Sequence, residues 1–470
     1  MLFSSSVFLF SFLPAVLILY YGFFRGNRPA QNFCLLLASL FFYAWGEPWF
    51  VLVMMGSIAV NYVLGRWAHR RRLRDRPAAP VVWAAAACNL GLLFLFKYLA
   101  FAVNTLNALG ARLPAPELAL PIGISFFTFQ ALSYVLDVAW GKAEVQRSLA
   151  GVGLYISLFP QLIAGPIVKY ATVARDLTGR RETWQDFSEG VCRFIAGLGK
   201  KVLLANQLAL VADAAFDGGG AGLTAPMAWL GAVCYTLQIY YDFSGYSDMA
   251  IGLGRMFGFH FLENFNYPYM ARSVTEFWHR WHISLSTWFR DYVYIPLGGS
   301  RVPSRLLEVR NLFVVWLLTG IWHGANWTFI CWGLYYFLLL AAEKFAGLGQ
   351  GWPVWARRVF TLVMVNFGWV IFRAPSLTAA AEYLSAMFRF AGNAAQTAQT
   401  MSVFRENWSV LAISILFSAP VATIFGRRPE RACAARFHGA AYVLLLTGVF
   451  LASISFLVKG TYNPFIYFNF

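Results

Sequence analysis

The stretch "VVWLLTGIWHGANWTFICWGLYYFLLL", Val314–Leu340, is the strongest indication of the class of fold in this sequence. It lies within a segment of 32 residues, Asn311 to Ala342, that contains no Asp, Glu, Lys or Arg. A helix needs only about 20 apolar residues to cross the hydrocarbon core of a bilayer. The segment is therefore a membrane element, and it is longer than one perpendicular crossing requires. We expect it to be broken near "GIWHGAN", or else another segment of the chain to be re-entrant.

The composition of the whole chain points to the same class of protein. Of the 470 residues 59% are hydrophobic and 12% are charged, and the mean hydropathy is +0.58. Long apolar runs dominate over amphipathic stripes, and they suggest about 10 to 12 spans when embedded pieces are allowed. The predicted fold class is therefore all-α, a polytopic transmembrane helix bundle.

The net charge of +16 has its own explanation in a membrane protein. Basic residues are concentrated in short connections such as "RGNR" (Arg25–Arg28) and "RWAHRRRLRDR" (Arg66–Arg76). Two apolar segments separate these connections, so both can face the cytoplasm, as the positive-inside rule requires. The charge therefore predicts orientation in a membrane, with the lipid bilayer as partner, and gives no reason to expect nucleic acid.

His323 is the one ionisable side chain in the opening stretch. At about 1.5 Å per residue it lies roughly 20 Å along a helix from Arg310, deep in the bilayer. Ionisable residues at such depth are costly and usually functional. Gly320 and Gly324 bracket it as G-x-x-x-G, a spacing that lets another backbone or a substrate come very close. The alternative is a packing pair of glycines with a histidine bonded to a neighbouring carbonyl.

A second informative stretch is "EFWHRWHISLSTWFRDYVYIPLGG", Glu276–Gly299. If it is one helix, His282 shares a face with Trp278 and Ser286 and follows Trp281 directly. An interfacial helix with an aromatic belt is the alternative for most of these residues. His279 and His282 form H-x-x-H, but no third ligand is evident and the six cysteines are scattered singly. We therefore predict no metal site.

Carboxylates inside apolar sequence predict buried ion pairs. Asp242 and Asp248 need cationic partners, and the nearby supply is Arg255, Arg280 and Arg290.

Gln161 lies between Pro160 and Pro166 in "LFPQLIAGPIVKY". Two prolines so close together indicate a broken helix, and broken backbone at membrane depth is tolerated only inside protein or beside a cavity. Gln161 is therefore a candidate for a cavity wall.

Two buried histidines suit proton transfer from a hydroxyl, because a neutral imidazole can act as a base. Acyl transfer from a thioester would also need donors for a developing oxyanion, such as Asn326 or the indole N–H of Trp322. The chain has no G-x-S-x-G element, so a serine nucleophile is unsupported. From these residues alone a transporter or flippase for a lipid-linked sugar, with the histidines as a proton relay, stays open, as does a scaffold.

Several motifs together resemble the membrane-bound O-acyltransferase (MBOAT) family, above all its bacterial branch that serves polysaccharide O-acetylation. They are "LPIGISFFTFQALSYVLDV", "LFPQLIAGPIVKY", "QIYYDFSGYSDMAIGLGRMFGFHFLENFNYPY", "EFWHRWHISLSTWFRDYVYIPLGGSR", "LLTGIWHGANWTFICWGLYYF" and "NFGWVIFRAP". The resemblance covers about residues 120 to 375. It implies a single integral membrane domain over 1–470, with amino-terminal helices over 1–119, a catalytic core over 120–375 and carboxyl-terminal helices over 376–470.

The resemblance also implies roles for individual residues. His323 in "WHG" matches the family's essential histidine, and His282 in "RWHISLS" matches its second histidine. The family's fold encloses a central tunnel with embedded or re-entrant short helices, so the candidates for its lining are Asn326, Trp322, Gly320, Gly324, Gln161, Ser286 and Trp281. His279 stands where relatives with "RRWH" carry arginine, which indicates a structural role for it.

The expected activity is transfer of an acetyl group from a cytoplasmic thioester, acetyl-CoA, across a bacterial inner membrane to an exported polysaccharide such as alginate. Acetyl-CoA would be a substrate, and no tightly bound cofactor is expected. Expected partners are periplasmic acetyltransferases that accept the acetyl group, the polysaccharide biosynthesis machinery and an acyl carrier protein. Peptidoglycan O-acetylation and teichoic-acid D-alanylation remain alternatives.

Overall fold

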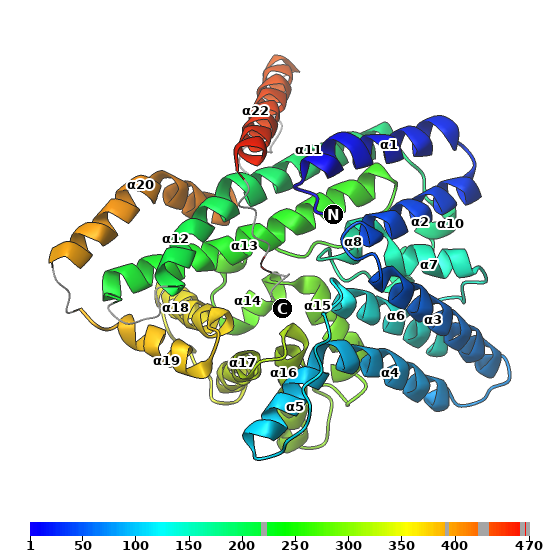
Figure 1. The fold of residues 1–470 in the computed structure, drawn as a ribbon, viewed down its shortest axis with the longest axis horizontal. Coiled ribbons are helices and arrows are strands. Elements are labelled where there is room, and N and C mark those ends of the chain that lie inside the picture. The colour runs from blue at the N-terminus through cyan, green and yellow to red at the C-terminus, as the bar shows by residue number, and fades with distance from the viewer. Residues whose placement is uncertain (218–222, 391–393, 422–431, 461–465, 467–470) are drawn as a thin grey trace. The chain divides into compact units, whose positions relative to one another are not determined.

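The computed structural model describes residues 1–217, 223–390, 394–421, 432–460 and 466 (Figure 1). This part of the chain folds into helices joined by turns and loops, and contains no strand. The predicted all-α class is thereby confirmed. The expected carboxyl-terminal section, 376–470, includes 391–393, 422–431, 461–465 and 467–470, which lie outside the described residues.

Six helical segments are long and apolar enough to cross a membrane among the described residues: Phe50–Arg72, Ala79–Ala108, Trp184–Phe216, Trp327–Phe345, Val354–Arg373 and Gly439–Lys459. Two shorter apolar helices span Phe8–Phe23 and Ile124–Ala139. The protein is a multi-pass membrane protein, because each of the six segments can satisfy its own backbone hydrogen bonds in lipid.

The contacts divide the chain into two compact units. Unit 1 comprises Met1–Phe194 and Tyr246–Leu262, and unit 2 comprises Ile195–Gly245 and Glu263–Phe470. Two helices, α11 (Trp184–Gly199) and α13 (Ala225–Met256), run through a boundary between the units.

Unit 1 is built on α2 (Arg28–Ala44), α3 (Phe50–Arg72), α4 (Ala79–Leu93), α6 (Ile124–Ala139) and α7 (Leu149–Ser157). Helix α6 is buried along its whole length, and it packs against α3, α4 and α7. The helix before Gln161 ends at Ser157, and a separate short helix, α8 (Phe159–Leu162), carries the glutamine. The predicted break in this segment is therefore confirmed.

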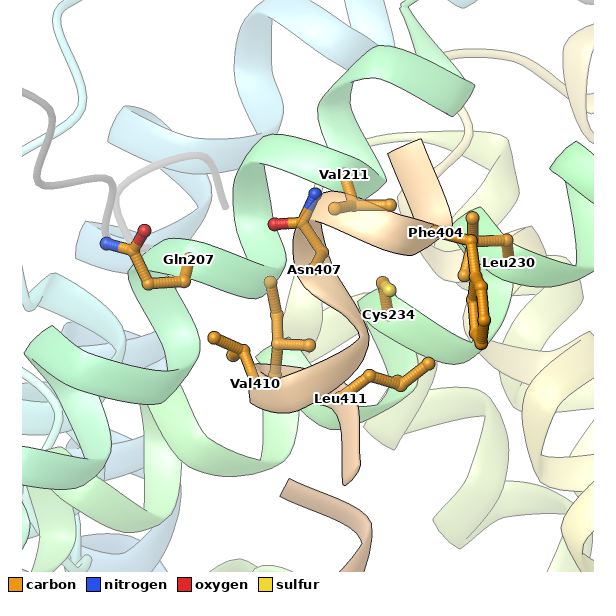
Figure 2. Close-up of a pocket in the computed structure, with 9 residues that line it drawn as sticks. Gln207, Val211, Leu230, Cys234, Phe404, Asn407, Val410 and Leu411 are labelled. Carbon is orange, nitrogen blue, oxygen red and sulfur yellow. The ribbon is translucent and has the colours of Figure 1, made fainter. Parts of the chain in front are cut away.

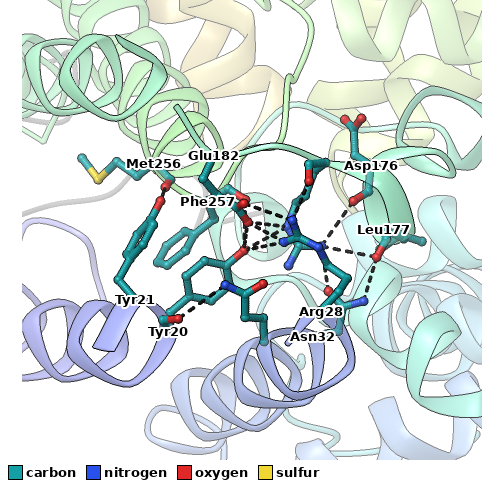
Figure 3. A network of polar contacts seen from close by, with 11 residues as sticks. Tyr20, Tyr21, Arg28, Asn32, Asp176, Leu177, Glu182, Met256 and Phe257 are labelled. Carbon is teal, nitrogen blue, oxygen red and sulfur yellow. Dashed lines mark hydrogen bonds and ion pairs between the residues drawn. The ribbon is translucent and has the colours of Figure 1, made fainter. Parts of the chain in front are cut away.

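A network of hydrogen bonds and ion pairs in unit 1 joins the segment from Tyr20 to Asn32 to the loop that carries Arg180 and Glu182 (Figure 3). The carboxylate of Glu182 accepts hydrogen bonds from the hydroxyl of Tyr20 and from the guanidinium of Arg28. The guanidinium of Arg180 donates to the Tyr20 hydroxyl at 3.1 Å and to Asn32 Oδ1 at 2.7 Å. Burial raises the pKa of Glu182, but its hydrogen bonds with Arg28 and Tyr20 lower it by more, so the net pKa lies below the ordinary value.

Unit 2 contains α12 (Asn206–Phe216), α14 (Val274–Arg280), α15 (Ile283–Phe289), α16 (Arg305–His323), α17 (Trp327–Phe345), α18 (Val354–Arg373), α19 (Leu377–Ala386), α20 (Ala394–Ser418) and α22 (Ala432–Lys459). Helix α17 packs against α16, α18 and the short α14 (Figure 1). At seven residues each, α14 and α15 are too short to cross a membrane.

The long apolar segment of unit 2 is broken where the sequence predicts. Helix α16 ends at His323, Gly324 is extended, and Asn326 caps α17 by accepting a hydrogen bond from the N–H of Thr328 at 3.1 Å. The chain therefore forms two helices, α16 and α17, in place of one long helix. The Asn326 cap satisfies a backbone N–H that the break would otherwise leave unpaired.

The buried carboxylates are paired, but their predicted partners are wrong. Asp242 in unit 2 pairs with Lys201 at 2.6 Å, and Asp248 in unit 1 pairs with Arg193 at 2.8 Å. Arg255, one of the expected partners, instead pairs with Glu189. The observed partners, Arg193 and Lys201, belong to the helical segment that precedes α13 in the chain. Packing places that segment beside α13, so the partners could not be chosen by closeness in sequence.

Candidate functional site

The stretch around His282 does not form the single helix predicted from its sequence. Helix α14 ends at Arg280, Trp281 is extended, and His282 adopts the left-handed conformation with φ +46° and ψ +52° before α15 begins. Such a conformation is unfavourable for a residue with a Cβ and persists only where its surroundings hold it. His282 and Ser286 therefore do not share the face of one helix, and that expectation is wrong.

Asn264 supplies the hydrogen bonds that replace the helix at this point. Its backbone carbonyl accepts the N–H of Ile283 at 3.0 Å, and its side-chain Oδ1 accepts the N–H of Ser284 at 3.1 Å and the Ser284 hydroxyl at 2.8 Å. Nδ1 of His282 lies 3.3 Å from the same Oδ1. Asn264 thus fixes both the backbone and the ring at His282.

The imidazole of His282 is 1% exposed, and its other nitrogen, Nε2, has no hydrogen-bond partner among the described residues. Burial lowers the pKa of His282 to about 3, because the charged form loses its hydration. The ring is therefore neutral at physiological pH.

His323 is also buried, at 5% exposure, at the carboxyl end of α16. Three aromatic rings surround its imidazole, with centroids 5.0 Å away for Trp322, 4.9 Å for Trp332 and 5.2 Å for Phe372. These rings come from α16, α17 and α18, so the packing of three helices in unit 2 positions one side chain.

A single indole connects the two histidines. The ring of Trp322 lies 5.0 Å from that of His323 and 6.0 Å from that of His282, centroid to centroid. The structure therefore brings both predicted histidines into one aromatic cluster of unit 2, although 41 positions separate them in the sequence.

Three rings of this aromatic cluster carry buried hydrogen-bond donors that no other described atom accepts. They are the indole N–H groups of Trp278 and Trp332 and the hydroxyl of Tyr336. The rings contact one another, with centroids 4.8 Å apart for Trp278 and Tyr336 and 5.3 Å apart for Trp332 and Tyr336. An unsatisfied buried donor costs about 1 to 3 kcal/mol, so this cluster is suited to an oxygen-containing guest.

The remaining predicted residues of unit 2 have structural contacts. Trp281 is buried against Trp369, at a centroid distance of 4.8 Å, and the hydroxyl of Ser286 donates to the Trp278 carbonyl at 3.3 Å. The side-chain amide of Asn326 donates to the carbonyl of Pro375 at 3.0 Å in addition to capping α17.

The two glycines of the G-x-x-x-G motif allow close approach by the chain itself. A Cβ on Gly320 would lie 2.5 Å from the carbonyl oxygen of Phe329, and a Cβ on Gly324 would overlap the ring of Phe329.

Gln161 belongs to unit 1, where its side-chain amide donates to the carbonyl of Tyr155 at 2.6 Å.

Sequence reasoning missed Asn264, Ser284, Trp332 and Tyr336 as members of the site. Asn264 lies in "ENFNYPY", between the helix that carries Asp242 and the stretch that carries His282. A short polar side chain immediately before turn residues was the available signal, because asparagine commonly bonds to backbone groups in such positions.

A hollow in unit 2 is lined by none of the site residues named above (Figure 2). Helices α12, α13 and α20 border this narrow space. Its lining is mostly apolar and includes Val211, Cys234 and Phe404, with Gln207 and Asn407 as the two polar side chains. Within the described part of the chain, no group of three His, Cys, Asp or Glu side chains is placed to hold a metal ion.

Comparison with known proteins gives this arrangement a context. Residues 146–380 match the model of the MBOAT, or membrane-bound O-acyltransferase, family. The chain is 41% identical to the probable alginate O-acetylase AlgI of Pseudomonas putida, and the alignment covers 100% of both chains. It is 33% identical to the peptidoglycan O-acetyltransferase of Helicobacter pylori over 89% of this chain and 86% of that one. Identity to the teichoic acid D-alanyltransferase of Bacillus subtilis is 27%, over 55% of this chain and 70% of that one.

Proposed function

Because this chain belongs to the membrane-bound O-acyltransferase family and is a membrane O-acetyltransferase, we propose that it takes acetyl groups from acetyl-CoA at the cytoplasmic face of a bacterial inner membrane. The acceptor would be a hydroxyl presented at the opposite face, on the route to an exported polysaccharide. Alginate is the leading candidate, because relatives named alginate O-acetylases are similar over most of the chain.

One observation carries the proposal: two buried imidazoles contact the same indole in a cluster that also holds unpaired donors. His323 acts as general base, taking the proton of the acceptor hydroxyl as the new ester bond forms. His282 orients the donor or relays a proton. The indole N–H of Trp332, next to His323, steadies the negative charge that develops on the carbonyl oxygen.

The remaining predicted residues have defined parts in this proposal. The indole of Trp322 contacts both imidazoles, while Gly320 and Gly324 bring α16 close to α17 and so set the position of His323. Ser286 and Asn326 hold the surrounding backbone, and Trp281 packs against Trp369. Gln161 would line a cavity within unit 1. The catalytic core would comprise residues 120–375.

The proposed partners follow from the same reaction. The acetyl group would pass to periplasmic acetyltransferases and the polysaccharide machinery, the partners that acetylation of an exported polysaccharide calls for. An acyl carrier protein is a further possible donor, since basic connections such as Arg66–Arg76 would attract an acidic protein.

The decisive experiment uses the purified full chain in lipid vesicles with acetyl-CoA labelled in the acetyl group. We expect thiol release and labelled ester to depend on His323. A transporter would instead move intact substrate without cleaving the thioester. An unchanged yield of labelled ester from His323→Ala would refute the catalytic role.

A further inference from the structure

We propose that Asn264 is a positioning residue that holds His282 in one tautomer, with a proton on Nδ1 and the lone pair of Nε2 presented for proton relay. This inference rests on the proposed function and chooses between the two roles left open there for His282.

The hydrogen-bond pattern identifies the donor and the acceptor. A backbone N–H can only donate, so the contact of 3.1 Å from Ser284 N identifies Oδ1 of Asn264 as an acceptor. The Nδ1 atom of His282, 3.3 Å from the same oxygen, can then bond to it only by donating a proton. A neutral imidazole that carries its proton on Nδ1 has its lone pair on Nε2.

The backbone leaves the ring little freedom to choose another partner. His282 is held in the left-handed region by two bonds from the following residues, Ile283 N to Asn264 O and Ser284 N to Asn264 Oδ1. The ring of Phe243 packs edge-on against the imidazole at 4.6 Å, and the ring of Trp322 lies at 6.0 Å. Nδ1 also lies 3.4 Å from the hydroxyl oxygen of Ser284. That hydroxyl donates its own proton to Oδ1 of Asn264 at 2.8 Å, so it too can only accept from Nδ1.

The lone pair on Nε2 gives this atom a chemical task. It is buried, and no described atom donates to it. In the transfer, the acceptor O–H bond breaks, an ester C–O bond forms and the thioester C–S bond breaks. The proton passes from the hydroxyl to His323, then to Nε2 of His282, and ends on the sulfur of the leaving thiol. Both histidines return to their starting state, so the step needs no further reactant.

Charged neighbours do not compete for this role, because the ionisable groups on adjacent elements are mostly paired with each other. The ion pairs are Asp242 with Lys201, Glu276 with Arg280, and Asp291 with Arg290. The other ionisable side chains are His279, which is exposed, and His323. Asn264 is thus the polar group that sets the state of the His282 ring.

The first test compares the pH dependence of thiol release from acetyl-CoA by the full chain in vesicles. Asn264→Asp keeps the acceptor oxygen and adds a negative charge, which favours the imidazolium form of His282. We expect the acid limb of the rate profile to move to higher pH by about one unit or more. Asn264→Ala should lower kcat about 10- to 100-fold with little change in KM for acetyl-CoA. Asn266→Asp, the same change at an exposed position two residues away, should leave the profile unchanged.

A purely structural asparagine would reduce the amount of folded enzyme without moving the pH profile. An acid limb of folded Asn264→Asp that coincides with that of the wild type would therefore overturn the inference. The proposed function would fail separately, through full activity of His323→Ala.

A second measurement needs no substitution at Asn264. Solid-state NMR of the wild-type chain labelled with nitrogen-15 histidine reports which ring nitrogen carries the proton, and the spectrum of His282→Gln identifies the signal. We expect the neutral form protonated on Nδ1. A signal from the form protonated on Nε2 would overturn the inference.

Discussion

Gly320 and Gly333 face each other where α16 crosses α17, so closely that a Cβ on Gly320 would lie 3.3 Å from the Cα of Gly333. A Cβ on Gly333 would in turn lie 2.5 Å from the carbonyl oxygen of Trp316. Backbone contact of this kind fixes the crossing of two helices without long side chains. Because His323 is three residues beyond Gly320, the crossing also fixes the imidazole.

Gly320→Ala should destabilise the protein by about 1 to 3 kcal/mol, because the added methyl group meets backbone atoms that cannot move aside. Thermal unfolding in detergent measures this effect, and acetyl transfer should fall as His323 shifts. Gly56→Ala is the matched control, since a Cβ there meets nothing within 4 Å in the middle of α3. That variant should be neutral or slightly more stable.

His323→Ala and His282→Ala should each reduce acetyl transfer at least about 100-fold while leaving a folded protein, because each removes a group that handles the proton. The measurement is labelled ester formed per amount of purified protein. His279→Ala serves as control, since that side chain is exposed and belongs to the same stretch. Equal losses in all three variants would indicate damage to the fold and not to the proton path.

Tyr336→Phe separates function from stability. Its hydroxyl has no described partner, so removing it should leave the melting temperature unchanged or higher. Acetyl transfer should nevertheless fall about tenfold, the effect of one lost hydrogen bond to substrate. Tyr335→Phe should do the reverse, because the Tyr335 hydroxyl donates to the Met364 carbonyl at 2.8 Å. A Tyr336→Phe enzyme with wild-type kinetics would remove this hydroxyl from the substrate site.

Glu182 links stability to pH in unit 1. Its lowered pKa means that the folded state favours the carboxylate, so this contribution is present above the ordinary value of 4.5 and is lost as pH falls through the folded value. Glu182→Gln should cost about 1 to 3 kcal/mol at neutral pH and flatten the acid loss of stability. Denaturation followed over a pH series measures both effects.

Glu144→Gln is the control for that series. The side chain of Glu144 is 83% exposed and contacts Arg72 at the surface, so its removal should change stability by less than about 0.5 kcal/mol. A similar response from both variants would mean that the polar network of Figure 3 contributes no more than a surface pair.

The class of fold and the reaction family could both be predicted from the amino-acid sequence alone. Runs without charge, such as Asn311–Ala342, can exist only as helices in lipid, because backbone groups there must be satisfied locally. Local signals also located the break between α16 and α17 and the break before Gln161, since glycine, asparagine and proline act on their immediate neighbours. The two histidines could also be named from the sequence, because they lie in motifs that resemble those of the family.

Contacts between residues that are distant in sequence could be identified only from the folded chain. The pairing of Asp242 with Lys201, the left-handed turn at His282 and its bond to Asn264 depend on contacts between segments that are far apart in sequence. Helical periodicity would place His282 and Ser286 on one face, but the chain turns at His282, where Asn264 accepts the N–H groups of Ile283 and Ser284. A local sequence pattern does not show whether a side chain from another segment will accept these N–H groups. Tertiary packing determines it, because it places Asn264 within hydrogen-bond distance of them.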